Sequence, residues 1–319
     1  MPVLKCPNGK WRIGTGPCVF TTRAAAERAY VAYLIQTHEE RKAVQVLKSV
    51  GLAIAAYREV SKRREWGRYK QTTSKLEPQM ARAVGKWMKQ IRSAVLAKMP
   101  KTVDGVDSIP WEKLEAAGEK VVGPLQEKSY AAGDRRLVRT LRKARIDPIG
   151  VRAKQYARTT GSKMITEITR ETREAVRKIV EDAIEAGLSP QQVERELRQV
   201  VGLTQAQAGK VSNQLTELLE AGMEEAKAFA AAERLASRAL AYRAEMIART
   251  EVNNALRTGI IETMSEAGVE RVEWVADPEA CEVCAGYNGN TYTIDEYEEI
   301  MNPHPNCECT VVMSSGEGL

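Results

Sequence analysis

Histidine is almost absent from this 319-residue chain, which contains only His38 and His304. His38 stands alone in a polar segment, so no helix carries the pair of histidines that typifies many catalytic metal sites. The sequence also lacks a glycine-rich phosphate loop and the strained turn that presents a nucleophilic serine. These absences remove the common enzyme signatures, and the sequence predicts a protein that is not an enzyme.

Long apolar runs are missing as well. The longest, Ser49–Tyr57, has about half the length that is needed to cross a bilayer. The first residues mix Lys5, Lys10 and Arg12 with glycine and proline, which does not resemble a signal peptide. We therefore expect no membrane partner and a protein that is cytoplasmic when it is synthesised.

Aromatic residues make up only 5% of the chain, whereas alanine and charged residues are abundant. This composition favours long helices over extensive sheets. We expect helices over residues 39–99, from Trp111 onward with a break at Gly123-Pro124, and over about 231–267. The chain should therefore be mainly α-helical.

Two short connections between helices carry recognisable stop and start signals. Gly187 suits the left-handed position after a helix, Ser189 can cap the next helix, and Pro190 fits its first position. The same device recurs as Gly202 followed by Thr204. Short helices with tight connections occur in nucleic-acid-binding hairpins and equally in plain packing units, so both interpretations stay open.

The net charge of +6 conceals an uneven distribution. Residues 181–319 contain 10 basic and 25 acidic residues, a net charge of −15, which leaves 38 basic and 17 acidic residues and a net charge of +21 for residues 1–180. A dense basic run lies at 135–145. A basic half favours an anionic partner, because phosphate contacts release counterions without needing special geometry. Nucleic acid, an acidic protein surface and the acidic half of a neighbouring copy all fit this charge.

Four of the six cysteines and one histidine gather near the end of the chain. Cys281 and Cys284 are three positions apart, as are His304 and Cys307, and Cys309 follows as a fifth candidate ligand. Two such pairs, each on a tight turn, can form the tetrahedral site that Zn²⁺ prefers. The cluster therefore predicts a zinc site, with either Cys307 or Cys309 as the fourth ligand.

Two alternatives to zinc are a pair of disulfides, which requires an oxidising compartment, and unligated thiols in a small core. Short strands are expected at 272–276, 290–294 and 310–313, and they bury little apolar surface. A module of this size commonly needs a metal or a disulfide to be stable. Because five donors leave no open coordination position, we expect a structural rather than a catalytic Zn²⁺.

A second cysteine pair, Cys6 and Cys18, lies in a segment that resembles a small ββα unit. Asn8-Gly9 is a hairpin turn signal, and Thr21 or Thr22 can cap the helix that follows. We expect Cys6 and Cys18 to be packed thiols, with a disulfide and half of a metal site as alternatives.

The C-terminal motifs together resemble a known family. In chain order, these motifs are Arg249-Thr250-Glu251 on a helix that ends at Gly268, Trp274 in a strand, Cys281-x-x-Cys284, Tyr287-Asn-Gly289, and His304-Pro305-Asn306-Cys307-x-Cys309. In this order they resemble the C-terminal domain of tailed-phage minor head proteins, the Mu F-type head morphogenesis family. The resemblance covers about residues 160–313.

The resemblance implies a low-copy virion protein located in the head near the portal, with the host cytoplasm as its site of assembly. Its implied role is head assembly and DNA packaging or delivery, with the portal protein and the major capsid or scaffold protein as partners. Packaged DNA, through the basic N-terminal half, and self-association are further expected contacts. Alternatives are a zinc-containing DNA-binding protein and a zinc-dependent nuclease or hydrolase, the latter requiring an open coordination site.

The expected architecture is an elongated, mainly helical body between two small modules. We divide the chain into a ββα docking unit at 1–36, a basic helical region at 37–160, a helical part of the head-morphogenesis domain at 161–268, and a zinc-stapled α+β module at 269–319. Arg249 and Glu251 lie too close in sequence to share one helix face, so we expect them to bond to different neighbours. A catalytic pair formed by these two residues is the alternative.

Overall fold

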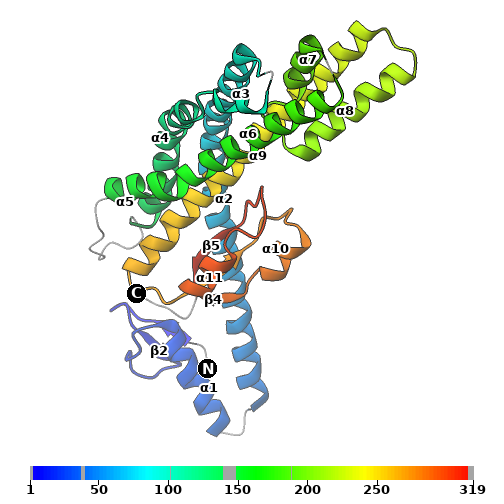
Figure 1. The fold of residues 1–319 in the computed structure, drawn as a ribbon. Helices are drawn as coiled ribbons and strands as arrows, with labels where there is room; N and C mark the ends of the chain where they lie inside the picture. The colour runs from blue at the N-terminus through cyan, green and yellow to red at the C-terminus, as the bar shows by residue number, and fades with distance from the viewer. Residues whose placement is uncertain (1–2, 37–39, 101, 139–148, 188, 315–319) are drawn as a thin grey trace. The chain divides into compact units, whose positions relative to one another are not determined.

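The structure, a computed structural model, describes residues 3–36, 40–100, 102–138, 149–187 and 189–314 (Figure 1). Most of the basic run at 135–145 therefore lies outside the described residues. The chain divides into two compact units, Met1–Glu65 and Trp66–Leu319. The boundary falls within helix α2 (Glu40–Lys98), so the α2 residues from Trp66 onward belong to the second unit.

In the first unit, strands β1 (Val3–Lys5) and β2 (Trp11–Ile13) pair in antiparallel fashion, and helix α1 (Arg23–Gln36) follows. Cys6 and Cys18 form a disulfide, so the expectation that they are packed thiols is wrong. The hairpin brings Trp11 back beside Phe20, and the two cysteine Cα atoms lie 6.2 Å apart, a separation that suits a disulfide.

The second unit is organised around α9 (Glu225–Glu266), a helix of 42 residues. Its buried apolar residues recur in steps of four, and alanines dominate its first half, which permits close helix packing. The buried row comprises Ala228, Ala232, Ala236, Leu240, Ala244, Ala248, Val252, Leu256, Ile260 and Met264. The predicted helix is confirmed, although it begins earlier than residue 231.

Helix α4 (Trp111–Val138) packs along α9 (Figure 1). At their closest approach, a Cβ on Gly133 would lie 2.2 Å from the carbonyl oxygen of Leu256, so only glycine fits there. The predicted break at Gly123-Pro124 is wrong, because Pro124 lies inside a continuous helix. Packing of α4 against both α6 and α9 outweighs the local penalty of one proline.

Shorter helices surround this pair. Helix α3 (Val103–Asp107) precedes α4, while α5 (Ile149–Tyr156) and the π-helix η1 (Ala157–Gly161) lead into α6 (Ser162–Glu185). Helices α7 (Pro190–Val200) and α8 (Gln205–Glu220) begin with capping boxes built on Ser189 and Thr204. The two predicted caps are therefore confirmed, with the preceding Gly187 and Gly202 at positive φ.

The end of the chain forms a small α+β module. Strands β3 (Arg271–Val275), β4 (Thr291–Thr293) and β5 (Thr310–Met313) make an antiparallel sheet of order β4-β3-β5. Helix α10 (Glu282–Tyr287) lies between β3 and β4, and α11 (Ile294–Ile300) follows β4 with a capping box from Thr293 and Glu296. All three predicted strands are confirmed.

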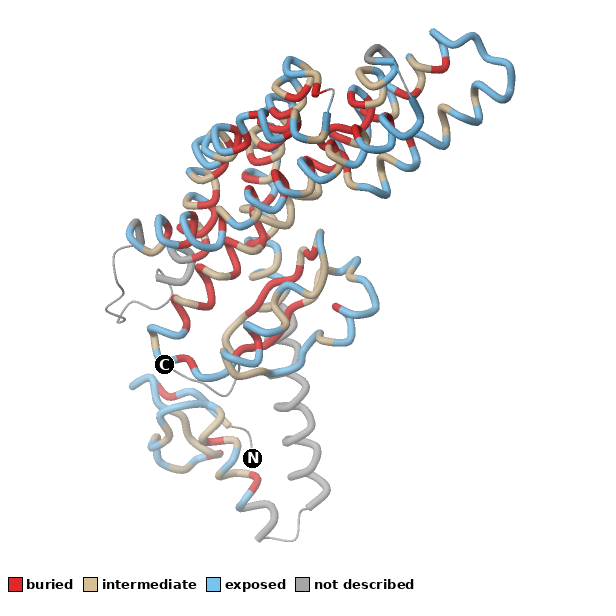
Figure 2. Tube along the Cα trace, in the orientation of Figure 1, coloured by how far each residue is buried: buried red, intermediate tan, exposed pale blue. Residues whose placement is uncertain are grey.

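Two main apolar cores hold the second unit together. Figure 2 marks the buried stretches of the chain in red. One lies among the helices and includes Trp87 and Val176. The other joins the C-terminal end of α9 to the small sheet and includes Trp274, Tyr297 and three cysteines. Within the described residues, no helix combines the length and apolar character that a membrane crossing requires.

Candidate metal centre

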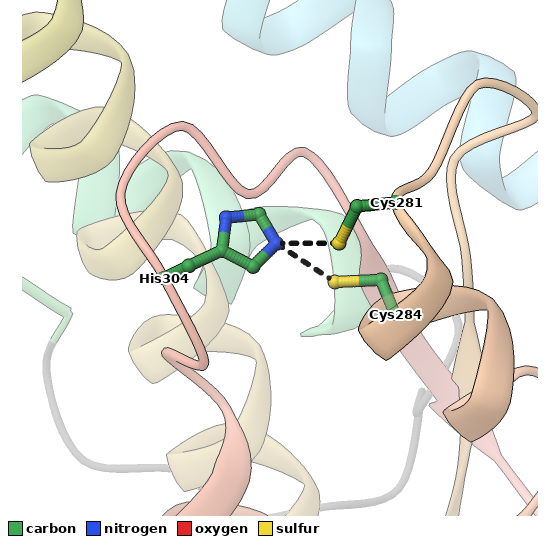
Figure 3. A group of neighbouring side chains, drawn as sticks. All are labelled: Cys281, Cys284 and His304. Atoms are coloured by element: carbon green, nitrogen blue, oxygen red, sulfur yellow. Dashed lines mark hydrogen bonds between the residues drawn. The ribbon is translucent and has the colours of Figure 1, made fainter.

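The cysteine and histidine side chains of the C-terminal module form one cluster, in which two groups of three side chains overlap at Cys284. Cys281 occupies the N-cap of α10 and Cys284 lies in its first turn, so both sulfurs face the same side. His304 approaches from the loop between α11 and β5, as Figure 3 shows. Its Nε2 lies 3.2 Å from Cys281 Sγ and 3.1 Å from Cys284 Sγ.

Cys307 and Cys309 complete the cluster from the other side of Cys284. Cys284 Sγ lies 3.8 Å from Cys307 Sγ, and the sulfurs of Cys284, Cys307 and Cys309 all lie within 4.8 Å of one another. Cys284 thus belongs to two overlapping triads, the other formed with Cys281 and His304. Cys281 is exposed, whereas the other three cysteines are buried. The cluster therefore reaches from the surface into the module's core and can hold a metal ion.

A tight turn sets the direction of the histidine. Asn306 adopts a left-handed conformation, with φ of 65°, which asparagine tolerates better than most residues. His304 Nδ1 lies 2.7 Å from the carbonyl oxygen of Pro305, a contact that places the ring proton on Nδ1. The Nε2 lone pair consequently faces the sulfurs, which is the orientation that a metal-ligating histidine requires.

The thiols of the cluster differ in pKa. A hydrogen bond from Cys309, together with the positive charge of Arg257, lowers the pKa of Cys307 to about 4. Burial raises the pKa of Cys284 to about 12. Because thiolates are the ligands, metal binding here would release the proton that Cys284 otherwise retains.

The Arg-Thr-Glu segment of α9 joins this module to the helices. Arg249 Nε lies 3.1 Å from a carboxylate oxygen of Glu308, between the two last cysteines. The Thr250 hydroxyl accepts a hydrogen bond of 3.0 Å from the backbone N–H of Asn306. Glu251 instead accepts a hydrogen bond from Gln126 on α4. The prediction that Arg249 and Glu251 bond to different neighbours is confirmed.

Glu251 should make stability depend on pH. Burial raises its pKa to about 7, so folding favours the protonated carboxyl. The stabilisation that the protonated Glu251 contributes should be complete below the unfolded-state pKa of about 4.3. It should be lost as the pH rises from there through about 7, because the native state binds more protons than the unfolded state between these two pH values. Glu251→Gln should flatten this part of the curve of unfolding free energy against pH. An unchanged slope in this variant would contradict the assignment.

Two further contacts at the site were not expected from the sequence. The guanidinium of Arg257 donates to Cys307 Sγ at 3.2 Å, and Lys70 on α2 pairs with Glu308. Arg257 follows Asn253 by one helical turn, and both are buried polar residues on α9. In the sequence, Asn253 and Arg257 interrupt an otherwise apolar helix face, and this interruption was the feature that could have pointed to a role for Arg257. Nothing in the sequence pairs Lys70 with Glu308, which is 238 positions away.

These features define a class of protein: a helical chain with a small cysteine- and histidine-rich α+β module fixed to its long helix. Residues 174–312 match the model of the family described as Phage Mu protein F like protein. These residues therefore form a Mu F-like domain, and the resemblance predicted from the motifs is confirmed. The matched residues contain all five candidate ligands. Searches of curated proteins and of solved structures gave no match.

Proposed function

We propose that the cluster holds one structural Zn²⁺, bound by Cys281, Cys284, His304 and a further thiolate. In a tetrahedral site with Zn–S of about 2.3 Å and Zn–N of about 2.0 Å, sulfur–sulfur edges are about 3.8 Å and sulfur–nitrogen edges about 3.5 Å. The distances of 3.8, 3.2 and 3.1 Å between the donor atoms lie within a few tenths of an ångström of these values. The donors therefore fit zinc in number and chemistry, and the pairs Cys281–His304, Cys284–His304 and Cys284–Cys307 also fit it in spacing.

A structural role for the metal is supported by what surrounds it. Cys284, Cys307 and Cys309 are buried in the same core as Trp274 and Tyr297. A catalytic zinc needs a position open to substrate and a nearby base, whereas the carboxylate nearest in sequence to the last ligands, Glu308, is paired with Lys70 and Arg249. This arrangement favours a metal that holds the loops together over a zinc-dependent hydrolase.

We further propose that the protein is a minor head protein of a tailed phage, present in few copies near the portal. The family match over residues 174–312 is the observation that carries this proposal, because the family is one of phage head proteins. In this role the chain would contact the portal protein and the major capsid or scaffold protein, and would act in DNA packaging or delivery. Self-association near the portal belongs to the same proposal.

Cross-linking mass spectrometry of purified heads tests the location. We expect a low copy number of this chain relative to the major capsid protein, and cross-links from its lysines to the portal protein. Heads that assemble without incorporating the chain at all would contradict the proposal.

A basic groove supports DNA as a further partner. Helices α2 and α9 border a groove of about 530 Å³ whose α2 side carries the exposed side chains of Arg82, Lys86 and Lys89. Among the described residues, none of these three cations has a carboxylate within ion-pair distance. Unpaired cations along a helix can neutralise successive phosphates without reading sequence.

Binding of duplex DNA should therefore weaken steeply as salt is raised. Replacing Lys86 and Lys89 together with glutamate should weaken binding and reduce the slope of log K against log salt by about 2, because each lysine that contacts a phosphate contributes about 1. The matched control replaces Lys113 and Lys120, exposed on α4, with glutamate. Equal losses in both double variants would assign the effect to net charge and remove the groove as the binding site.

A further inference from the structure

Arg257 is a fully buried cation without a carboxylate partner. Its side chain projects from α9 into the C-terminal module, and the residue is 1% exposed. Nη1 donates to Cys307 Sγ at 3.2 Å, and Nη2 donates to the side-chain oxygens of Asn254 and Asn302 at 3.0 and 3.1 Å. Among the described residues, no aspartate or glutamate forms an ion pair with it.

Such a guanidinium needs a negative charge beside it. Removing an unpaired cation from water costs several kcal/mol, and two amide oxygens supply only partial charge. Among the described residues that accept a hydrogen bond from Arg257, the one that can carry a full negative charge is Cys307, through its sulfur. A Zn²⁺ ion bound by three thiolates and one neutral imidazole has a net charge of −1, which one arginine balances.

We infer that Arg257 is the built-in counter-charge of the metal centre and selects Cys307, rather than Cys309, as its fourth ligand. This inference rests on the proposed zinc site and deepens it. The guanidinium is a positioning residue: it acts on the metal through the sulfur of Cys307, whose charge it stabilises, and does not itself ligate.

The surroundings of the two cysteines differ in the way this assignment requires. Both sulfurs lie within 4.8 Å of Cys284 Sγ, but Cys307 Sγ receives a donor from a full cation. Cys309 Sγ receives only the neutral backbone N–H of Asp277, at 3.4 Å. If Cys309 were the fourth ligand and Cys307 a neutral thiol, Arg257 would remain buried without a charged partner. The geometry therefore favours Cys309 as a thiol packed in the core.

Asn302 extends the role of Arg257 to the loop that carries the ligands. It precedes His304 by two positions, and its side-chain oxygen accepts from the same Nη2 that Asn254 on α9 holds. The guanidinium thus links the helix, the start of the ligand loop and the Cys307 sulfur. Arg257 thus both balances the charge of the metal centre and positions the loop that carries the ligands. We therefore expect the metal affinity to depend on Arg257.

Cobalt substitution of the full chain identifies the fourth ligand. With Co²⁺ as the probe, the intensity of the thiolate-to-metal charge-transfer band reports how many thiolates bind. We expect Cys309→Ser to retain the wild-type band and Cys307→Ser to lose part of it together with metal affinity. The reverse pattern would overturn the assignment.

Zn²⁺ affinity, measured by chelator competition, tests the counter-charge. Arg257→Met should lower the affinity about 10- to 100-fold, the usual effect of removing a partner of a metal ligand, while the metal-free chain should become no less stable. Arg257→Lys, which keeps the charge, should recover most of the affinity. Equal affinities for wild type and Arg257→Met would overturn the inference, as would a Lys variant no better than Met. A wild-type chain that binds no Zn²⁺ would instead contradict the proposed zinc site itself.

Discussion

Replacing Cys284 with serine is expected to abolish zinc binding and to unfold the C-terminal module. Cys284 is the one residue that belongs to both triads, and it lies 1% exposed in the core beside Trp274. Structural zinc contributes an apparent free energy of about 10–16 kcal/mol in small zinc domains, so its loss removes most of the stability that such a module has. The helices have their own core around Trp87 and should remain folded.

Hydrogen exchange measured segment by segment can show that the C-terminal module unfolds while the helices stay folded. In Cys284→Ser, protection should disappear over residues 271–313 and persist in α4 and the first half of α9. Cys6→Ser is the matched control, because Cys6 belongs to the other unit and should leave zinc content unchanged. Retained protection over 271–313 in a zinc-free variant would show that the module needs no metal.

Replacing Trp87 with alanine should destabilise the helices and leave zinc binding intact, the opposite of the result expected for Cys284→Ser. Trp87 is fully buried among the helices, its indole N–H donates to the carbonyl oxygen of Leu114 at 2.7 Å, and its ring leaves no space for a Cβ on Gly118. Truncating a buried tryptophan to alanine typically costs about 3–5 kcal/mol. The free energy of unfolding of the helices should fall by this amount, while the zinc content stays at the wild-type level.

Trp87→Phe provides the matched comparison. It keeps an aromatic ring in the core but removes the hydrogen bond to Leu114, so the loss should be smaller, about 1–3 kcal/mol. Denaturant unfolding followed by circular dichroism measures both variants. Equal stability of Trp87→Ala and the wild-type chain would mean that the packing described for this core is wrong.

Several elements were predictable from the sequence because their signals are local. The strands of the C-terminal sheet and the caps at Ser189 and Thr204 follow from alternation and turn chemistry within a few residues. The buried row of α9 follows from its spacing of four. The convergence of Cys281, Cys284 and His304 was predictable for a different reason, since few chemistries place these residue types at this spacing.

Other features depend on contacts between distant residues. Pro124 is tolerated because α4 is packed on two sides, which its own sequence does not reveal. The Cys6–Cys18 disulfide depends on how the hairpin folds back, and spacing alone wrongly favours packed thiols over a disulfide. Arg257 reaches a sulfur 50 positions away, and its role emerges only when its burial and the absence of a carboxylate partner among the described residues are known.

Native mass spectrometry of the purified, full-length chain tests the central claim most directly, because it counts metal ions and free thiols in one measurement. We expect one Zn²⁺ per chain, and we expect a strong chelator to remove both this ion and the hydrogen-exchange protection of residues 271–313. A chain that carries no metal, yet keeps this module folded and its four C-terminal cysteines as free thiols, would contradict the account.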